Sequence, residues 1–262
     1  MSADSPFNPF QAGADYIQAN TRKSQTVTVD ISWIIDASLS MQPLWDELVR
    51  RSEKIGELFN RALPAELTGK VSAFRLQLIA FRDIYMDSTA IECSPFFNIY
   101  SECSEISRFI QSIRPMGGGI AQKSALEALF CAMHGDWRRS GEDNRHILCL
   151  ITDSSAYLPE DPQRRGDKIY SETLGSFTSD PCEVMPNNMD GMRRLWRDGA
   201  GTLDNWKSRL VLLAPSWELW LGVALWPRVS HLAYAPDAVT SLPLETIVSE
   251  SCRPLFPHLS AL

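Results

Sequence analysis

The sequence predicts an α/β fold in which a doubly wound, mostly parallel central sheet carries helices on both faces. Stretches that are typical of strands alternate along the chain with stretches at helical spacing, which indicates a parallel sheet. Residues 146–151 and 209–214 are almost continuously apolar, as strands buried on both faces are. The chain has 262 residues, 44% of them hydrophobic and 22% charged, enough to surround one large core.

The first half of the chain contains three predicted strands. Residues 27–35 alternate between apolar and polar and then run apolar up to Asp36, which predicts the first strand. A helix is expected over residues 43–63, starting at Pro43 and ending before Pro64. Residues 74–81 form the second expected strand. Residues 91–99 are expected to form a weaker, antiparallel edge strand, because Pro95 cannot donate to a central ladder.

The second half repeats the alternation. Helices are predicted over residues 104–113, 121–133 and 189–197, with the triplet Gly117 to Gly119 as a tight loop before the second of them. Strands are predicted over residues 146–151, 209–214 and 229–234, and a short terminal helix over residues 244–248. Together these elements describe one domain over residues 25–262, with a long surface excursion at about residues 157–187 and a flexible arm over residues 1–24.

Charge and cysteine usage narrow the function classes. The net charge is −7 and the pI is near 5.2, which argues against a nucleic-acid binder and against electrostatic docking on an anionic membrane. The longest apolar stretch, residues 210–226, is interrupted by Pro215 and Glu218 and is too short to span a bilayer. The start of the chain does not have the pattern of a signal peptide. The six cysteines form no C-x-x-C pair, so we expect no structural zinc and a cytoplasmic location.

Oxygen-bearing side chains follow two of the predicted strands. Asp36, Ser38 and Ser40 come directly after the first strand, and Asp153 follows strand 146–151. Ligands of open α/β sheets bind at the carboxyl ends of strands, where strand order reverses. Carboxylates and hydroxyls are the hard oxygen ligands that Mg²⁺ prefers, and two hydroxyls two residues apart in an extended turn point the same way. These four residues are therefore the predicted metal ligands.

Other interpretations of the same residues stay open. Ser38 and Ser40 could cap the helix that begins near Pro43, and Asp153 could cap its own loop. Asp36 could be the nucleophile of a metal-dependent phosphotransferase or hydrolase. The dehalogenase pattern, however, needs a second carboxylate where Ser38 stands, and the chain has neither a Gly-x-Ser-x-Gly elbow nor a Walker phosphate loop.

The segment Asp36-Ala37-Ser38-Leu39-Ser40 resembles the metal-ion-dependent adhesion site of the von Willebrand factor A (vWA) family. Further similarities are Ala80-Phe81-Arg82-Asp83, the glycine loop with the helix after it, and residues 209–215, so the resemblance covers residues 27–250. It is strongest to bacterial vWA proteins of tellurium-resistance-type stress operons. It implies a cytoplasmic protein-binding adaptor rather than an enzyme, with bound Mg²⁺ (or Mn²⁺ or Ca²⁺). The implied partner is a protein, such as a kinase or phosphatase, that offers an acidic residue to the metal.

One position departs from the family pattern. Family members usually have Thr or Asp directly after the glycine run, whereas this chain has Ile120, which cannot ligate a metal. Gln122 and Ser124 are the nearest polar substitutes. The departure leaves a metal-free scaffold as a second interpretation of the same fold. Arg82 and Asp83 are expected to form a structural ion pair, and the tryptophans of residues 217–226 are expected to pack in the core or, where exposed, to contact a partner.

Overall fold

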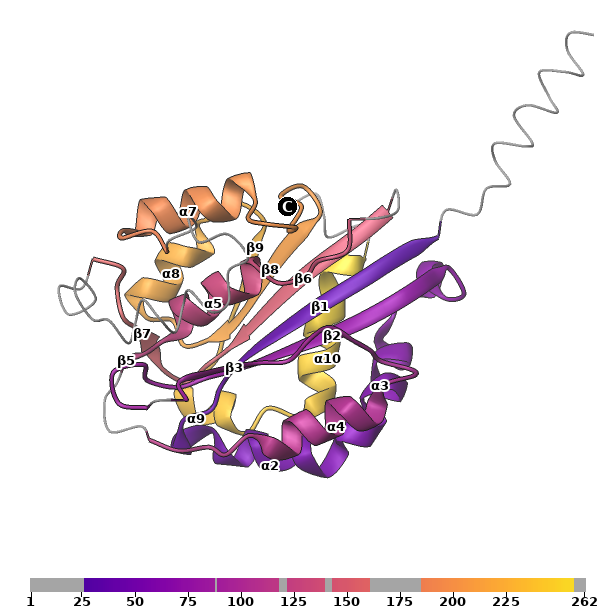
Figure 1. The fold of residues 1–262 in the computed structure, drawn as a ribbon, viewed down its shortest axis with the longest axis horizontal. Helices are drawn as coiled ribbons and strands as arrows, with labels where there is room; N and C mark the ends of the chain where they lie inside the picture. Colours follow the sequence, from indigo (N-terminus) through magenta and orange to yellow (C-terminus); the bar gives the residue numbers. More distant parts are fainter. Residues whose placement is uncertain (1–25, 88, 118–121, 140–142, 161–184, 257–262) are drawn as a thin grey trace, which may run out of the picture.

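A computed structural model of the chain describes residues 26–256 except 88, 118–121, 140–142 and 161–184. It shows the predicted α/β fold: a seven-stranded sheet with helices on both faces (Figure 1). The strand order is β3-β2-β1-β6-β8-β9, with β4 also paired to β2. The ladders β2-β1-β6-β8-β9 are all parallel, and only β3 and β4 run antiparallel. The strands are β1 (Val27–Asp36), β2 (Val71–Phe81), β3 (Ile91–Cys93), β4 (Phe97–Asn98), β6 (Asp143–Ile151), β8 (Ser208–Ala214) and β9 (Val229–Ala233).

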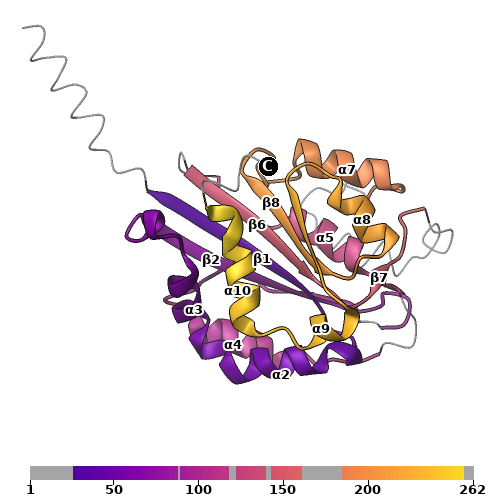
Figure 2. The same cartoon turned by 180° about the vertical axis from the view of Figure 1, so that it is seen from behind.

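Helices cover the two faces of the sheet in separate groups (Figures 1 and 2). One face packs against α2 (Gln42–Arg51), α3 (Ile55–Ala62), α4 (Cys103–Ser112), α9 (Pro236–Thr240) and α10 (Leu244–Cys252). The other packs against α5 (Ala125–Met133), α7 (Met189–Asp198) and α8 (Glu218–Ala224). Trp33 of β1 is fully buried, and its indole nitrogen donates to Ser251 Oγ of α10 at 2.9 Å. This contact ties the terminal helix to the middle of the sheet.

Several predicted elements have different bounds. The expected helix 43–63 is two helices, because the 3-10 turn Ser52–Lys54 separates α2 from α3. The expected edge strand 91–99 splits into β3 and β4 on either side of Pro95, which has no N–H for a ladder. Gln122–Lys123 is not helical as predicted but forms β5, which pairs with β7 (Ser155–Ala156) in a small second sheet. The helices α8 and α9 were not predicted.

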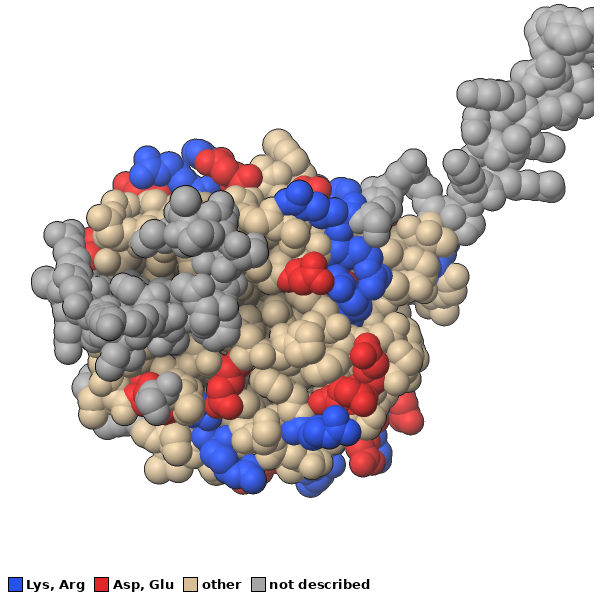
Figure 3. All heavy atoms as spheres, in the orientation of Figure 1, with Lys and Arg blue, Asp and Glu red and all other residues tan. Residues whose placement is uncertain are grey.

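Other predictions concern residues that lie wholly or partly outside the described ones. The arm over residues 1–24, most of the excursion 157–187, Gly118, Gly119 and Ile120 belong to this group. No helix in the described part of the chain is long and apolar enough to cross a membrane. Lys and Arg side chains gather near the starts of the parallel strands, and elsewhere on the face drawn in Figure 3 the two signs are interspersed.

The order of the strands places the predicted metal ligands at one edge. The chain passes from β1 to β2 on one side and later returns to β6 on the other side, so strand order reverses between β1 and β6. These two strands pair in parallel up to Ile35 opposite Ile151. Asp36 and Thr152 therefore leave the sheet side by side, at the kind of crevice where α/β proteins bind ligands.

Candidate metal centre

Asp36 is the most deeply buried of the four predicted ligands, with an exposed fraction of 0%. Its Oδ1 accepts the backbone N–H of Ser38 at 2.8 Å, and its Oδ2 accepts the Thr152 hydroxyl at 2.8 Å. Trp45 of α2 donates its indole N–H to the backbone carbonyl of Asp36 at 2.8 Å, which holds the end of β1 in place. The carboxylate is thus oriented by two neighbouring loops at once.

Burial raises the pKa of Asp36 from 3.8 to about 6. Hydrogen bonds from Ser38 and Thr152 lower the pKa, but the loss of solvation outweighs them, and the nearby charge of Asp153 raises it further. The two carboxylates are therefore close enough to repel each other. A divalent cation between them would relieve this repulsion and replace the lost solvation of Asp36.

The two serines of the motif do not cap a helix. Ser38 stands at the N-cap of the 3-10 turn Leu39–Met41, yet its side chain makes no capping hydrogen bond. Its Oγ lies 3.1 Å from Oγ of Ser40 instead. Ser38 is buried and Ser40 is exposed, so the pair leads from Asp36 to the surface. Capping therefore does not account for the two hydroxyls, and their closeness suits two neutral ligands of one cation.

Asp153 lies next to this group at the end of β6. Its side chain is largely buried, and its Oδ1 accepts the hydroxyl of Ser154 at 2.8 Å. Within the described part of the chain, its Oδ2 makes no hydrogen bond that would occupy it. The hydrogen bond from the adjacent Ser154 could be accepted equally well by a neutral amide oxygen, so it does not explain why a carboxylate stands at this position. No described residue thus competes with a ligand for Oδ2 of Asp153.

Thr152 is a member of the site that the sequence interpretation did not single out. Its hydroxyl donates to Asp36 Oδ2 and accepts the backbone N–H of Ser154 at 3.0 Å. The fully buried threonine therefore links the first motif to the loop of Asp153. Its place directly before Asp153 at a strand end was the only signal in the sequence.

The glycine loop approaches the motif, but the proposed substitutes for Ile120 do not. The carbonyl of Gly117, which has a φ of 70°, accepts the N–H of Leu39 at 3.3 Å. Ser124 is fully buried, and its hydroxyl accepts the N–H of Ile84 at 2.9 Å, which ties α5 to the end of β2. Gln122 lines a groove between α7 and α8. The expectation that either side chain supplies a fifth ligand finds no support in these contacts.

The expected ion pair between Arg82 and Asp83 is wrong. Arg82 is almost fully buried and pairs instead with Glu92 at 2.8 Å and Asp87 at 3.6 Å. Asp83 accepts the hydroxyl of Tyr157 at 2.9 Å. Both residues nevertheless have the structural role that was expected, because they hold the loops around the end of β2.

The centre contains few of the groups that make other metal sites recognisable. Among the described residues, no three His, Cys, Asp or Glu side chains come together as a possible metal cluster. The three described histidines each face a backbone carbonyl, those of Phe130, Arg138 and Ala214. The candidate donors are therefore two carboxylates and the hydroxyls of Ser38 and Ser40, all hard oxygens. This donor set fits Mg²⁺, Mn²⁺ or Ca²⁺ rather than zinc or copper.

Comparisons with known proteins add little to this geometry. No family model matches the chain, and no curated protein matches its sequence. Among solved structures it is similar to the pilus adhesin SpaC from Lactobacillus rhamnosus GG, with a TM-score of 0.47 in one crystal form and 0.38 in the open conformation. Both are 11% identical and match 86% of this chain, which spans 31% and 30% of the adhesin chains. These values carry no conclusion about family or activity.

Proposed function

We propose that this protein is a metal-dependent protein-binding module of the vWA type, which holds one divalent cation with Asp36, Ser38, Ser40 and Asp153. The observation that carries the proposal is that two carboxylates and two serine hydroxyls, which do not cap a helix, lie together where strand order reverses. Thr152 orients Asp36 from the second loop. Mg²⁺ is the proposed ion, because it accepts neutral hydroxyls and keeps water in its remaining positions.

The proposed partner is a protein that offers a carboxylate to the cation. Among the described residues, two carboxylates, those of Asp36 and Asp153, would bind the ion, so they would at most balance its charge and its open positions would suit an acidic side chain. The exposed Ser40 and the 60% exposed Leu39 place these positions at the surface. The proposed kinase and phosphatase partners and the stress-response role rest on the family resemblance alone, and the proposed cytoplasmic location rests on it and on the cysteine pattern.

Two other functions are less well supported by the contacts. A metal-free scaffold would leave Asp36 buried with its hydrogen bonds from Ser38 and Thr152 as the only compensation. A hydrolase with Asp36 as the nucleophile needs the reacting centre of a substrate to reach that carboxylate, whose exposed fraction is 0%. None of the described histidines hydrogen-bonds to the cluster as a base would.

Calorimetric titration with Mg²⁺ and Mn²⁺ tests the metal directly. We expect one site per chain in the wild type, no binding in Asp36→Asn, and an affinity at least about tenfold weaker in Asp153→Asn. Ser124→Ala and Asp46→Asn are the matched controls, because Ser124 is engaged with Ile84 and Asp46 is an exposed carboxylate on α2. Both controls are expected to bind like the wild type. A wild type that binds neither ion would reject the metal-dependent function in favour of the scaffold.

Thr152→Val is expected to weaken Mg²⁺ binding by about 10- to 100-fold, as the loss of an outer hydrogen bond to a ligand does elsewhere. The substitution removes the hydroxyl that orients Asp36 Oδ2 but keeps the branched shape of the side chain. Thr152→Ser, which retains the hydroxyl, is expected to keep most of the affinity. Equal affinities of the valine and serine variants would show that Thr152 does not position the ligand.

A further inference from the structure

The outer face of α8 is unusually apolar. Trp217, Leu221 and Leu225 recur every fourth residue from the N-cap to the C-cap of this helix, and they are 37%, 48% and 81% exposed. A helix on the surface of a soluble protein normally carries charged side chains on its outer face. Here Glu218 is the only charged residue of the helix. A contiguous exposed apolar face of this kind marks an interaction surface.

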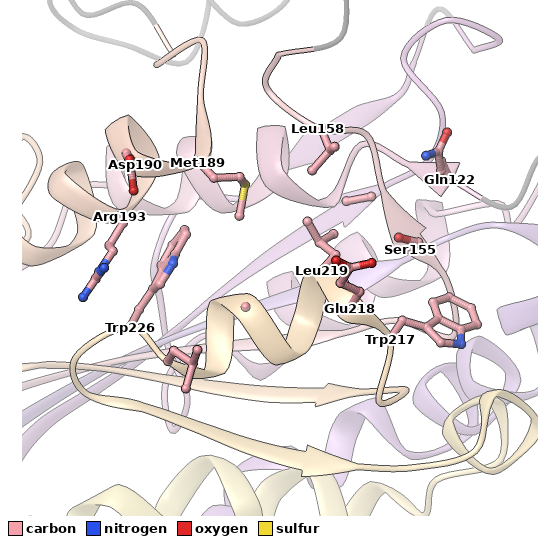
Figure 4. A pocket seen from close by; sticks show the side chains of 13 residues that line it. Gln122, Ser155, Leu158, Met189, Asp190, Arg193, Trp217, Glu218, Leu219 and Trp226 are labelled. Atoms are coloured by element: carbon pink, nitrogen blue, oxygen red, sulfur yellow. The ribbon is translucent and has the colours of Figure 1, made fainter.

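A groove runs along the same helix, between α8 and α7. It encloses about 690 Å³. Ala156 of β7 lines it. Leu158 lines it from the chain after β7, Met189 from α7, and Leu219 and Trp226 from the region of α8 (Figure 4). The groove and the outer face of α8 share Trp217 and Leu225, so they form one continuous surface.

Gly222 lies in the middle of α8 and also lines the groove. A Cβ atom built on it would meet no atom within 4 Å, so packing inside this chain does not require glycine there. Glycine has the lowest helix propensity of any residue except proline. It does, however, allow another backbone to approach closely.

Two opposite charges stand at the two ends of the groove. Glu218 lies beside Trp217 at one end, and Arg193 of α7 lies near Trp226 at the other (Figure 4). Both side chains are exposed, and neither forms an ion pair with another described residue. The surface therefore has an apolar centre with the carboxylate of Glu218 at one end and the guanidinium of Arg193 at the other, where Asp190 of α7 also lines the groove.

We propose that this surface binds a second copy of the chain, with the two α8 helices packed antiparallel about a two-fold axis near Gly222. A two-fold axis reverses the direction of the partner helix, so Glu218 of one copy faces Arg193 of the other, and the pair occurs twice. The outer face of α8 in each copy covers the groove of the other copy. One short helix and its groove form a small interface, so the dimer is reversible and weak.

Sedimentation equilibrium of the full chain, from low micromolar to near millimolar concentration, tests the dimer. We expect a reversible monomer–dimer equilibrium. Leu221→Glu should raise the dimer dissociation constant by about 100-fold, because a loss of about tenfold per site occurs twice at an isologous interface. Met86→Glu, at a residue that is 72% exposed and lies outside the groove, should leave the constant unchanged.

Two further variants separate a lost interface from a damaged fold. Gly222→Leu should make the protein monomeric yet raise its melting temperature, because leucine favours the helix and its Cβ meets no atom within 4 Å in the single chain. Glu218→Arg and Arg193→Glu should each weaken the dimer several-fold, and the double variant should restore it. A protein that stays monomeric to near-millimolar concentration would overturn the proposal, as would a dimer that tolerates Leu221→Glu or is not restored by the double variant.

Discussion

Replacing Asp36 with asparagine is expected to abolish Mg²⁺ binding and, without metal, to raise the free energy of unfolding at pH 7 by roughly 1–3 kcal/mol. The gain follows from the burial that raises the pKa of Asp36 to about 6. Asparagine has the same shape without the charge. Its carbonyl oxygen can accept the Ser38 N–H, and its amide can donate to the Thr152 hydroxyl, which rotates to accept.

The direction of the pKa shift determines how the stability contribution of Asp36 changes with pH. The pKa of Asp36 is higher in the folded than in the unfolded chain, so its protonated form stabilises the fold. This contribution is complete below pH 4 and is lost as the pH rises through 6. Without metal, the wild type should therefore lose about 2 kcal/mol of stability relative to Asp36→Asn between pH 4 and pH 7. Urea unfolding of both proteins across this range measures the difference, and parallel pH profiles would contradict the prediction.

The same proton competes with the cation. A metal ligand must be deprotonated, so the Mg²⁺ affinity of the wild type should rise with pH up to about 6 and then level off. Saturating Mg²⁺ should also remove the stability penalty of the ionised carboxylate. Calorimetric titrations at pH 5 and pH 7 check this coupling. Together these results would show that the buried carboxylate is kept for binding at the expense of stability.

The sequence predicts the part of the centre that depends on local patterns. Runs of apolar residues predict the buried strands, and Asp36 and Asp153 lie where those runs end. A hydrogen bond such as that between Thr152 and Asp36 joins residues that are 116 positions apart. It depends on the register of β6 against β1, which local sequence patterns do not predict. The contact between Ser124 and Ile84 was missed for the same reason.

Helix α8 shows a different limit. Residues 218–224 follow the apolar strand β8 after only a short break, and Gly222 lowers their helix propensity. The apolar residues of this segment occur on its exposed face as well as its buried one, so it lacks the amphipathic period by which a surface helix is recognised. The apolar exposed face of α8 thus prevents its prediction from hydrophobic periodicity, and the same face marks the helix as an interaction surface.

Arg75→Met is expected to destabilise the protein by about 3–5 kcal/mol, the largest effect of any single substitution proposed here. Asp30 of β1 is 1% exposed, and Arg75 of β2 contacts both of its carboxylate oxygens, at 2.9 and 2.6 Å. Without the guanidinium, the buried carboxylate keeps, among the described residues, only the hydrogen bond from the N–H of Arg138 at 2.9 Å. Loss of the contact between Arg75 and the ring of Phe96 adds to the cost.

Two comparisons separate the buried charge from the loss of the arginine itself. Asp30→Asn placed in the Arg75→Met background removes the uncompensated charge, so it should recover a large part of the lost stability in urea unfolding. Arg61→Met breaks an exposed pair with Glu57 and should change the free energy of unfolding by less than about 1 kcal/mol. If the double variant is no more stable than Arg75→Met, the packing of the arginine rather than the charge of Asp30 carries the effect. In either case Mg²⁺ binding at 20 °C should persist in the folded fraction, because Asp30 and Arg75 lie toward the start of β1 and β2, whereas Asp36 ends β1 at the opposite edge.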